Sequence, residues 1–255
     1  TEARMTEYVG KHTSIPVPEM LAVGEDYYLA EWCDGLPSDG PDVDEADVRA
    51  LGRTMARLHE ESGFDAPGRP RADGEGLTVD ANESWHAVVS DFLRDLRGPL
   101  ADAGRTEIVD FVLEFLADHP ALCANTGDPV LCHGTLLPDH LAIDSNDHET
   151  VTCVIDFEHA IVGPPAYDYW RTALPLEANE DEWALPAFRE GYATVRPLPE
   201  NHDRHRLLYT SLVTLTYLES LYVQDQHDER ETERQANWMC EYVHESLDDL
   251  AVAIE

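Results

Sequence analysis

The chain has 255 residues, with 52 Asp and Glu against 17 Lys and Arg, so its formal net charge is −35. Such a surface repels nucleic acid and anionic lipid, which excludes both as expected partners. No apolar run approaches the roughly 18 residues of a membrane span, and no signal peptide is visible, so the expected location is the cytoplasm.

The acidity fits two kinds of protein. One is a disordered acidic chain. The other is a folded protein from a high-salt cytoplasm, where carboxylates hold hydration and salt screens their repulsion. Hydrophobic residues make up 43% of the chain, which also has five Trp and ten Tyr, and this content favours folding. We therefore expect a halophilic globular protein.

The cysteines are odd in number and form no CxxC or CxxH pair. They are Cys33, Cys123, Cys132, Cys153 and Cys240. Most stand among apolar neighbours. This pattern indicates small buried side chains in a reducing compartment rather than a disulfide framework or a zinc site.

The first part of the chain predicts a small mixed α/β unit. Residues 1–10 have a helical pattern, and the two prolines of Ser14–Glu19 indicate an extended segment. Met20–Val23 and Tyr27–Trp32 are predicted as two short strands of a hairpin. An acidic segment with Pro and Gly, Pro37–Asp44, is a candidate domain boundary.

The remainder is predicted to be mostly helical. Val48, Leu51, Met55 and Leu58 recur at three- and four-residue spacing, which indicates a helix from Asp44 to Ser62. The following segment, Gly63–Leu77, is typical of a surface loop. Further helices are expected at about 82–97, 105–118, 167–174, 181–195, 203–225 and 229–252. Strands are expected at 130–132, 141–144 and 151–155, with a turn at 145–147.

Side chains that could bind a metal or take part in catalysis are concentrated between residues 130 and 168. An apolar strand that ends at Asp156 would hold a carboxylate beside a cleft, and Mg²⁺ binds such hard oxygen ligands together with water and phosphate. A hairpin brings the start of one strand close to the end of its partner, so the loop 133–140 should face Asp156. The expected constellation is His133, Thr135, Asp139, His140, Asp156 and Glu158.

These segments resemble the catalytic core of the aminoglycoside phosphotransferase family, which includes choline kinase-like enzymes and shares the protein-kinase fold. The family pattern is H-G-D-x-x-P-x-N, a hairpin, two apolar residues with D-[WF]-E, and G-x-P-x-x-D. The segments that follow it here are His133-Gly134, Pro138, Ile155–Glu158 and Gly163–Asp168. The segments Ile15–Pro18, Tyr28–Glu31, Asp34-Gly35 and Leu51–His59 match further parts, so the resemblance spans most of 1–195.

The resemblance implies an α+β, protein-kinase-like fold. Residues 1–37 would be the remainder of a small N-terminal lobe and hinge. Residues 38–255 would form a large, mostly helical lobe that carries the active-site loop and hairpin at 130–168. The implied activity is transfer of phosphate from ATP, with Mg²⁺, to a hydroxyl of a small molecule. No oligomeric state follows from the sequence.

The resemblance also implies roles by position in the loop and hairpin. Asp156 and His140 take the places of the metal ligands. Asp168 would support the loop, and His133 would be its structural histidine. Thr135 stands at the position of the catalytic aspartate.

Three further positions belong to the implied ATP site. The hinge would pass through Glu31 to Cys33, and Glu2 falls where the family has its small-lobe helix glutamate. The family's phosphate-gripping lysine lies on a preceding strand, and Lys11 follows Glu2, so it cannot replace that lysine. We therefore expect an N-terminally truncated sequence, or a protein without that part of the site.

Two departures concern the chemistry itself. A threonine hydroxyl at Thr135 cannot act as a base near neutral pH, although it can orient a hydroxyl or a water. Asp139, four residues along the same loop, could substitute. Imidazole at His140 is a poor Mg²⁺ ligand and suits softer metals.

Three hypotheses follow. The first is a small-molecule kinase that uses ATP and Mg²⁺. The second is a catalytically impaired pseudokinase of the same fold that binds a nucleotide or small ligand. The third, from another class, is a metal-dependent hydrolase, although no HExxH or similar ligand spacing is present. Its residues would be His133, Asp139, His140, Asp156 and His159.

Overall fold

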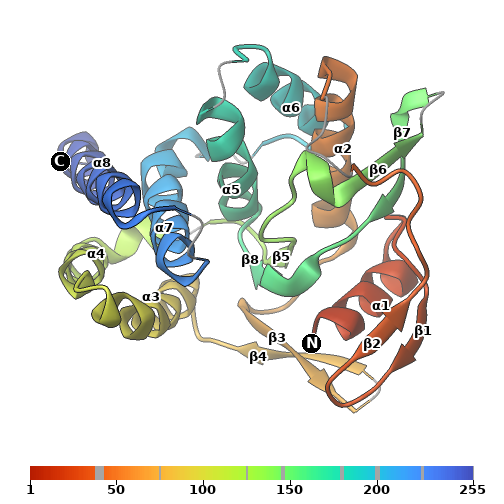
Figure 1. Ribbon diagram of the computed structural model, residues 1–255, viewed down its shortest axis with the longest axis horizontal. Coiled ribbons are helices and arrows are strands. Elements are labelled where there is room, and N and C mark those ends of the chain that lie inside the picture. Colours follow the sequence, from red (N-terminus) through yellow and green to blue (C-terminus); the bar gives the residue numbers. More distant parts are fainter. Residues whose placement is uncertain are drawn as a thin grey trace. The chain divides into compact units, whose positions relative to one another are not determined.

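The structure is a computed structural model that combines α-helices with short strands (Figure 1). It describes residues 1–37, 43–74, 76–124, 126–144, 147–178, 181–198, 202–224 and 227–254. The helices are α1 (Glu2–His12), α2 (Glu45–Glu61), α3 (Trp85–Asp102), α4 (Thr106–Asp118), α5 (Pro165–Ala178), α6 (Ala184–Ala193), α7 (His202–Val223) and α8 (Glu229–Ile254). The strands are β1 (Met20–Val23), β2 (Tyr28–Ala30), β3 (Gly68–Asp73), β4 (Gly76–Ala81), β5 (Val130–Cys132), β6 (Leu141–Asp144), β7 (Asp147–Val154) and β8 (Ile161–Gly163).

The chain divides into two compact units, each made of two stretches of sequence. The first contains Thr1–Glu83 and Gly127–Glu200, and the second contains Ser84–Thr126 and Asn201–Glu255. All the predicted site residues belong to the first unit. The expected boundary near residue 37 falls within this unit, and residues 38–42 of the predicted linker lie outside the described residues. The division into two lobes therefore stays a prediction.

Helix α2 forms where the apolar spacing predicts it. Asp44 caps its N-terminus, because one carboxylate oxygen accepts hydrogen bonds from the amides of Ala46 (2.7 Å) and Asp47 (3.0 Å). Leu51, Met55 and the other apolar side chains of the inner face are buried. The same buried face carries His59, which the site uses.

Helices α2 and α6 lie side by side and touch at two glycines (Figure 1). A Cβ atom on Gly52 would overlap the carbonyl oxygen of Phe188, and one on Gly191 would overlap the carbonyl oxygen of Arg49. Glycine at both positions lets the two backbones approach. The close approach also seats Tyr192, which is fully buried.

The substitution Gly52→Ala is expected to destabilise the fold by about 2–3 kcal/mol, because the added methyl meets backbone atoms that cannot rotate away. The free energy of unfolding in urea measures the effect. Gly63→Ala is the matched control, since the space around Gly63 is open. Equal stability of the two variants would contradict this account of the helix crossing.

One prediction for this unit is wrong. The segment expected to be a surface loop, Gly63–Leu77, contains all of β3 and the start of β4, which pair in register from Gly68↔Ala81 to Asp73↔Gly76. The four-stranded sheet has the order β4-β3-β8-β5. Arginine, proline and glycine obscure the alternation of β3 in the sequence, and pairing with β8 supplies what the local pattern lacks.

The predicted hairpin around the site is confirmed. Strands β6 and β7 pair antiparallel, with Leu141 opposite Val154 and Ala142 opposite Cys153. Residues 145 and 146 of the expected turn lie outside the described residues. Strand β5 pairs with β8 instead, through Leu131↔Val162. The site thus lies where two separate strand pairs end.

Helix α1 and the hairpin of β1 and β2 also follow the prediction, and α1 packs against β1 (Figure 1). The hairpin leaves several large apolar side chains in solvent, namely Leu21, Tyr27, Leu29 and Trp32. None of the helices in the described part of the chain has the length and apolarity that a membrane crossing requires.

The cysteine prediction is wrong for one pair. Cys33 and Cys153 form a disulfide, with their Cα atoms 6.1 Å apart, within the usual range for such bonds. The segment after β2 passes beside β7, and a separation of 120 residues gave no local sign of that contact. Cys123 and Cys132 are free and buried, as expected, and Cys240 is free and half-buried.

In the second unit, α3 packs against α4 and α7 against α8. The Tyr242 hydroxyl donates to Thr210 Oγ1 at 3.0 Å, and Arg105 bonds both Tyr222 (3.1 Å) and Glu233 (2.6 Å). The helices expected in this part of the sequence are confirmed. Leu212, Leu215 and Leu218 of α7 are buried, whereas Leu207 and Leu221 are only half-buried.

Candidate active site

Asp156 stands two residues after the end of β7 and is held in a strained backbone conformation. Its φ of 69° and ψ of 55° lie in the left-handed region, and it is the one described residue other than glycine with positive φ. The preceding residue, Ile155, is held by hydrogen bonds at both its amide and its carbonyl. The Ile155 amide donates to the His140 carbonyl (3.1 Å), and His133 Nε2 donates to the Ile155 carbonyl (2.9 Å). These hydrogen bonds fix the backbone from which the Asp156 carboxylate projects.

His140 faces Asp156 across the hairpin. It is the last residue of a short 3-10 turn, Pro138–His140, just before β6. Its Nε2 lies 3.1 Å from Asp156 Oδ2, and its Nδ1 lies 2.6 Å from the Thr135 carbonyl oxygen. The side chains of His140 and Asp156 are 16% and 31% exposed, so both open toward solvent. The two predicted metal-ligand positions are therefore neighbours.

One buried carboxylate, that of Asp168 in α5, binds the start of the loop 133–140. Its oxygens accept hydrogen bonds from the amides of His133 (2.9 Å) and Gly134 (2.8 Å). His59 Nε2 donates to it at 2.9 Å, and the Tyr192 hydroxyl donates to His59 Nδ1 at 2.9 Å. Burial opposes ionisation of Asp168, but the bond from His59, the nearby His133 and the Gly134 amide outweigh it and lower its pKa.

Gly134 explains the His-Gly pair of the loop. Its φ is +90°, and a Cβ atom there would overlap the His159 carbonyl oxygen. Only glycine accepts both constraints. Further along, the Thr172 hydroxyl donates to the Leu136 carbonyl at 2.8 Å. Helix α5 therefore holds the loop at two places.

His133 is a neutral, buried hydrogen-bonding residue. Its Nε2–H donates to Ile155, and its Nδ1 accepts a long bond from the Thr135 amide at 3.4 Å. Burial lowers the pKa of His133 to about 4, although the Asp168 carboxylate works in the opposite direction. Its role as the structural histidine of the loop stays a prediction.

The pKa of His133 predicts a pH dependence of stability. The unfolded histidine binds a proton near pH 6.5 and the folded one only near pH 4, so its contribution is complete above pH 6.5 and falls by about 3 kcal/mol between these values. Urea unfolding of the wild type and His133→Gln at pH 7 and pH 4.5 measures it. The variant should lose less stability on acidification. Equal losses would contradict the assignment, and His227→Gln, at an exposed position, is the control.

The two remaining loop residues differ in exposure. The Thr135 hydroxyl is buried and has no hydrogen-bond partner among the described residues. The Asp139 side chain is 53% exposed, and its Oδ1 lies 3.8 Å from His140 Nε2, too far for a hydrogen bond. Asp139 is thus the open carboxylate of the loop.

A pocket of about 580 Å³ joins all the predicted cofactor and metal residues. These are Glu2, Glu31, Cys33, His140 and Asp156. The other lining residues are Thr6, Pro18, Met20, Tyr28, Ala30, Trp32, Leu36 and Ile155. No Lys or Arg is among these residues. The loop residues His133, Thr135 and Asp139 do not line it.

Tyr28 is a pocket residue that the sequence reasoning missed. Burial and a hydrogen bond to Glu2 raise its pKa, and the charges of Asp156 and Glu158 add to the rise. Its phenol shares the lining of the pocket with the carboxylates of Glu2, Glu31 and Asp156. The position at the start of a hairpin strand, one residue after exposed Tyr27, gave no sign of this.

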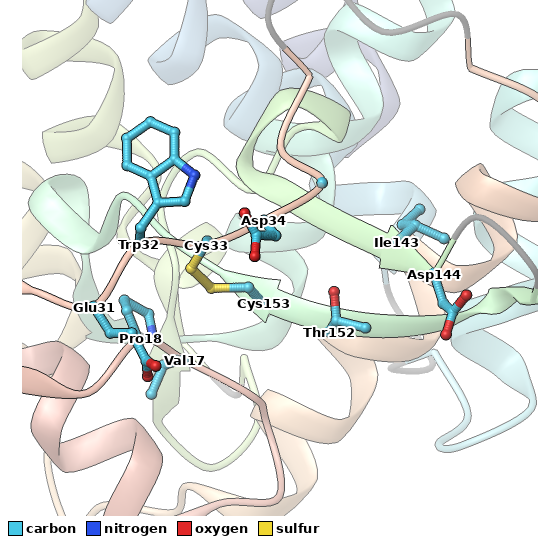
Figure 2. Close-up of a pocket in the computed structure, with 11 residues that line it drawn as sticks. Val17, Pro18, Glu31, Trp32, Cys33, Asp34, Ile143, Asp144, Thr152 and Cys153 are labelled. Atoms are coloured by element: carbon cyan, nitrogen blue, oxygen red, sulfur yellow. A yellow bond between two sulfur atoms is a disulfide. The ribbon is translucent and has the colours of Figure 1, made fainter.

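A second pocket of about 570 Å³ shares the segment Glu31–Cys33 with the first. Figure 2 shows the Cys33–Cys153 bond joining this segment to β7, with Thr152 farther along the strand. Trp32 points away from the disulfide and is 82% exposed. The expected hinge is therefore covalently fastened to the hairpin that carries Asp156.

A different group of possible metal ligands lies deeper. His59, Cys132 and Asp168 each place one ligand atom within 4.8 Å of the others, and all three are buried. Hydrogen bonds to Tyr192 and to the loop amides already occupy His59 and Asp168. This cluster is a support for the loop.

The residues of the hydrolase hypothesis do not converge in the described structure. His133 is turned to the Ile155 carbonyl, and His159 Nε2 lies 3.3 Å from Glu158 in a half-exposed pair. His140 Nε2 lies 3.1 Å from Asp156 Oδ2 and 3.8 Å from Asp139 Oδ1, but among the described residues these side chains do not form a group of three mutually close ligand atoms. The geometry gives this hypothesis no further support.

The comparisons with known proteins agree with this geometry. The phosphotransferase enzyme family matches residues 1–208. The aminoglycoside 3'-phosphotransferase of Streptomyces fradiae is 28% identical over 213 residues, which are 81% of this chain and 73% of that protein. The chain therefore belongs to the phosphotransferase enzyme family.

Solved structures share the fold. A thermostable aminoglycoside phosphotransferase in complex with ADP and hygromycin B has a TM-score of 0.63 at 16% identity, covering 97% of this chain and 82% of that one. A candidate fructosamine-3-kinase from Thermobifida fusca has a TM-score of 0.63 at 19% identity, covering 96% and 79%. A macrolide 2'-phosphotransferase from Brachybacterium faecium has 0.52 at 23%, covering 92% and 77%. The α+β, protein-kinase-like fold class expected from the sequence is confirmed.

Proposed function

We propose that this protein transfers a phosphoryl group from ATP, with a divalent cation, to a hydroxyl of a small molecule. The main observation in support is that one pocket is lined by all the residues predicted to bind the cofactor and the metal, namely Glu2, Glu31, Cys33, His140 and Asp156. Family membership supports phosphotransfer in general, and the relative that holds ADP supports ATP as the donor.

The charge of the pocket supports a cation-dependent nucleotide. A triphosphate carries several negative charges, and the lining residues include three carboxylates but no Lys or Arg. Asp156 offers the hard oxygen ligand that Mg²⁺ takes, and His140 would be the second ligand. When bound, the cation neutralises charge on the phosphates. Residues such as Met20, Ala30 and Ile155 offer apolar walls for the purine ring.

We propose Asp139 as the group that accepts the proton of the substrate hydroxyl. It is the open carboxylate of the loop, whereas the Thr135 hydroxyl is buried. Asp168, His59 and Gly134 would position the loop. Loss of a general base costs about 10²–10⁴ in rate, so Asp139→Asn should lower kcat by that factor with little change in KM.

The substrate is proposed to be a hydroxyl-bearing small molecule. The relatives are described as acting on aminoglycosides, macrolides and fructosamine, which are all hydroxylated. A net charge of −35 favours cationic members of this group over anionic ones.

The test is ATP turnover by the full chain in concentrated KCl. Aminoglycosides, a fructosamine and a macrolide serve as acceptors, with Mg²⁺ and Mn²⁺ in parallel, and ADP and phosphorylated product are quantified by mass spectrometry. We expect equal amounts of both products with at least one acceptor. Absence of ADP formation with every acceptor and either metal would overturn the proposal.

The buried hydroxyl of Thr135 favours a second candidate, a nucleotide-binding pseudokinase. Stabilisation by ATP and metal, without ADP from any acceptor, would identify it. Measurable turnover that Asp156→Ala abolishes would exclude it.

The cellular setting stays a proposal as well. A halophilic origin predicts that the melting temperature rises when KCl goes from 0.1 M to 2 M, because screening weakens repulsion among the excess carboxylates. A flat or falling melting temperature would contradict this origin. The Cys33–Cys153 disulfide stands against a cytoplasmic location, because such bonds are rare in reducing compartments.

A further inference from the structure

We infer that His140 and Asp156 form a mixed nitrogen–oxygen site that selects a first-row divalent transition cation, such as Mn²⁺ or Co²⁺, over Mg²⁺. The inference rests on the proposed function, because it concerns the cation that accompanies the nucleotide in the same pocket. Its evidence is the geometry around the His140 ring.

The orientation of the ring is that of a metal ligand. Nδ1 lies 2.6 Å from the Thr135 carbonyl oxygen, which can only accept, so Nδ1 carries the hydrogen. Metal-binding histidines usually donate their second ring N–H to a carbonyl or carboxylate in this way. Nε2 is then the ring atom left to bind a metal, and it faces Asp156.

The spacing of the two donor atoms is that of two ligands on one cation. His140 Nε2 lies 3.1 Å from Asp156 Oδ2. Ligand distances of about 2.1 Å place two donors about 3.0 Å apart in octahedral and about 3.4 Å apart in tetrahedral geometry. The observed spacing falls within this range.

The backbone at both ligand residues is fixed in position. The His140 carbonyl accepts from the Ile155 amide at 3.1 Å, which ties the two ligand-bearing segments together. The left-handed conformation of Asp156 turns its carboxylate toward the pocket. Partial exposure of both side chains leaves room for water and phosphate oxygens to complete the coordination.

The nitrogen ligand decides the selectivity. Mg²⁺ prefers oxygen donors and keeps its waters, whereas imidazole binds the later divalent first-row metals more strongly. The carboxylates of Glu2 and Glu31 in the same pocket raise the affinity for any dication without distinguishing among them. His140 is therefore the residue on which discrimination depends.

The test measures metal binding without turnover. The full chain is titrated with Mn²⁺, followed by electron paramagnetic resonance, and with Co²⁺, followed by visible absorption, both with a non-hydrolysable ATP analogue. Mg²⁺ is titrated as the competitor. Nitrogen hyperfine coupling to bound Mn²⁺ reports a histidine ligand directly. The variants are His140→Asn and, as control, His227→Asn, which replaces an exposed histidine outside the pocket.

We expect nitrogen coupling in the wild type and in His227→Asn, and its loss in His140→Asn. Removal of the ligand should weaken Mn²⁺ and Co²⁺ binding at least about 10–100-fold, while Mg²⁺ binding holds or strengthens. Coupling that persists in His140→Asn, or Mg²⁺ that binds the wild type as tightly as Mn²⁺, would overturn the inference. Circular dichroism of each variant confirms that it is folded.

The outcome separates this inference from the proposed function. Turnover with ATP but no nitrogen coupling would leave the phosphotransferase standing and remove the transition-metal site. Nitrogen coupling without turnover from any acceptor would keep the site and favour the pseudokinase.

Discussion

Asp156→Ala is expected to lower phosphotransfer by at least about 10²–10³-fold, the loss seen when one group that stabilises transition-state charge is removed. The carboxylate is a hard oxygen ligand that follows β7, and its residue has the left-handed backbone conformation. Without it, His140 faces the pocket alone and the phosphates lose their anchored cation. The loss of stability should be modest, about 1 kcal/mol, because the side chain is 31% exposed and alanine tolerates the left-handed conformation less well than aspartate.

Steady-state and single-turnover assays of ADP release measure this effect. Asp156→Asn is the isosteric variant and should show a similar loss, because the amide keeps the shape but not the charge. Asp26→Ala is the matched control, since Asp26 is an exposed carboxylate in the β1–β2 turn. Retention of more than about a tenth of the wild-type rate in Asp156→Ala would contradict the assignment.

Asp168→Ala is expected to destabilise the first unit by about 3–5 kcal/mol, the cost of breaking a buried charged network from one side. The change leaves the amides of His133 and Gly134 and the ring of His59 without their acceptor, all of them buried. Activity should fall with stability, because the loop that carries Asp139 starts at these amides.

Urea unfolding at pH 7 measures the loss, with Asp65→Ala at an exposed site as control. The pKa of Asp168 is lowered in the folded state, so its contribution is complete above the ordinary value of 3.8 and is lost as pH falls through the lowered one. Asp168→Asn keeps one acceptor oxygen and should cost less than alanine. A loss in Asp168→Ala below about 1 kcal/mol would contradict the network.

The helical part of the fold was predictable because its evidence is local. Apolar residues at three- and four-residue spacing in α2, with Asp44 as cap, need no distant partner to be recognised. Strands β3 and β4 were missed for the opposite reason. The segment Gly68–Asp73 contains Arg, Pro and Gly, and only its antiparallel partner makes it a strand.

The residues of the site likewise divide into those recognisable from local sequence and those whose contacts depend on distant segments. Asp156 could be located from the sequence, since an apolar strand that ends in Asp-Phe-Glu is a local pattern in family register. The sequence also determined that position 135 carries threonine and position 140 histidine, together with the acidic surface and the family itself.

The tertiary structure alone decided which of these residues meet. It turned the His140 ring between the Thr135 carbonyl and Asp156, buried the Thr135 hydroxyl, and left Asp139 open. It also joined Cys33 to Cys153. The physical reason is that these contacts depend on how the backbone folds in three dimensions. Residue type and local spacing do not show which segments the fold brings together.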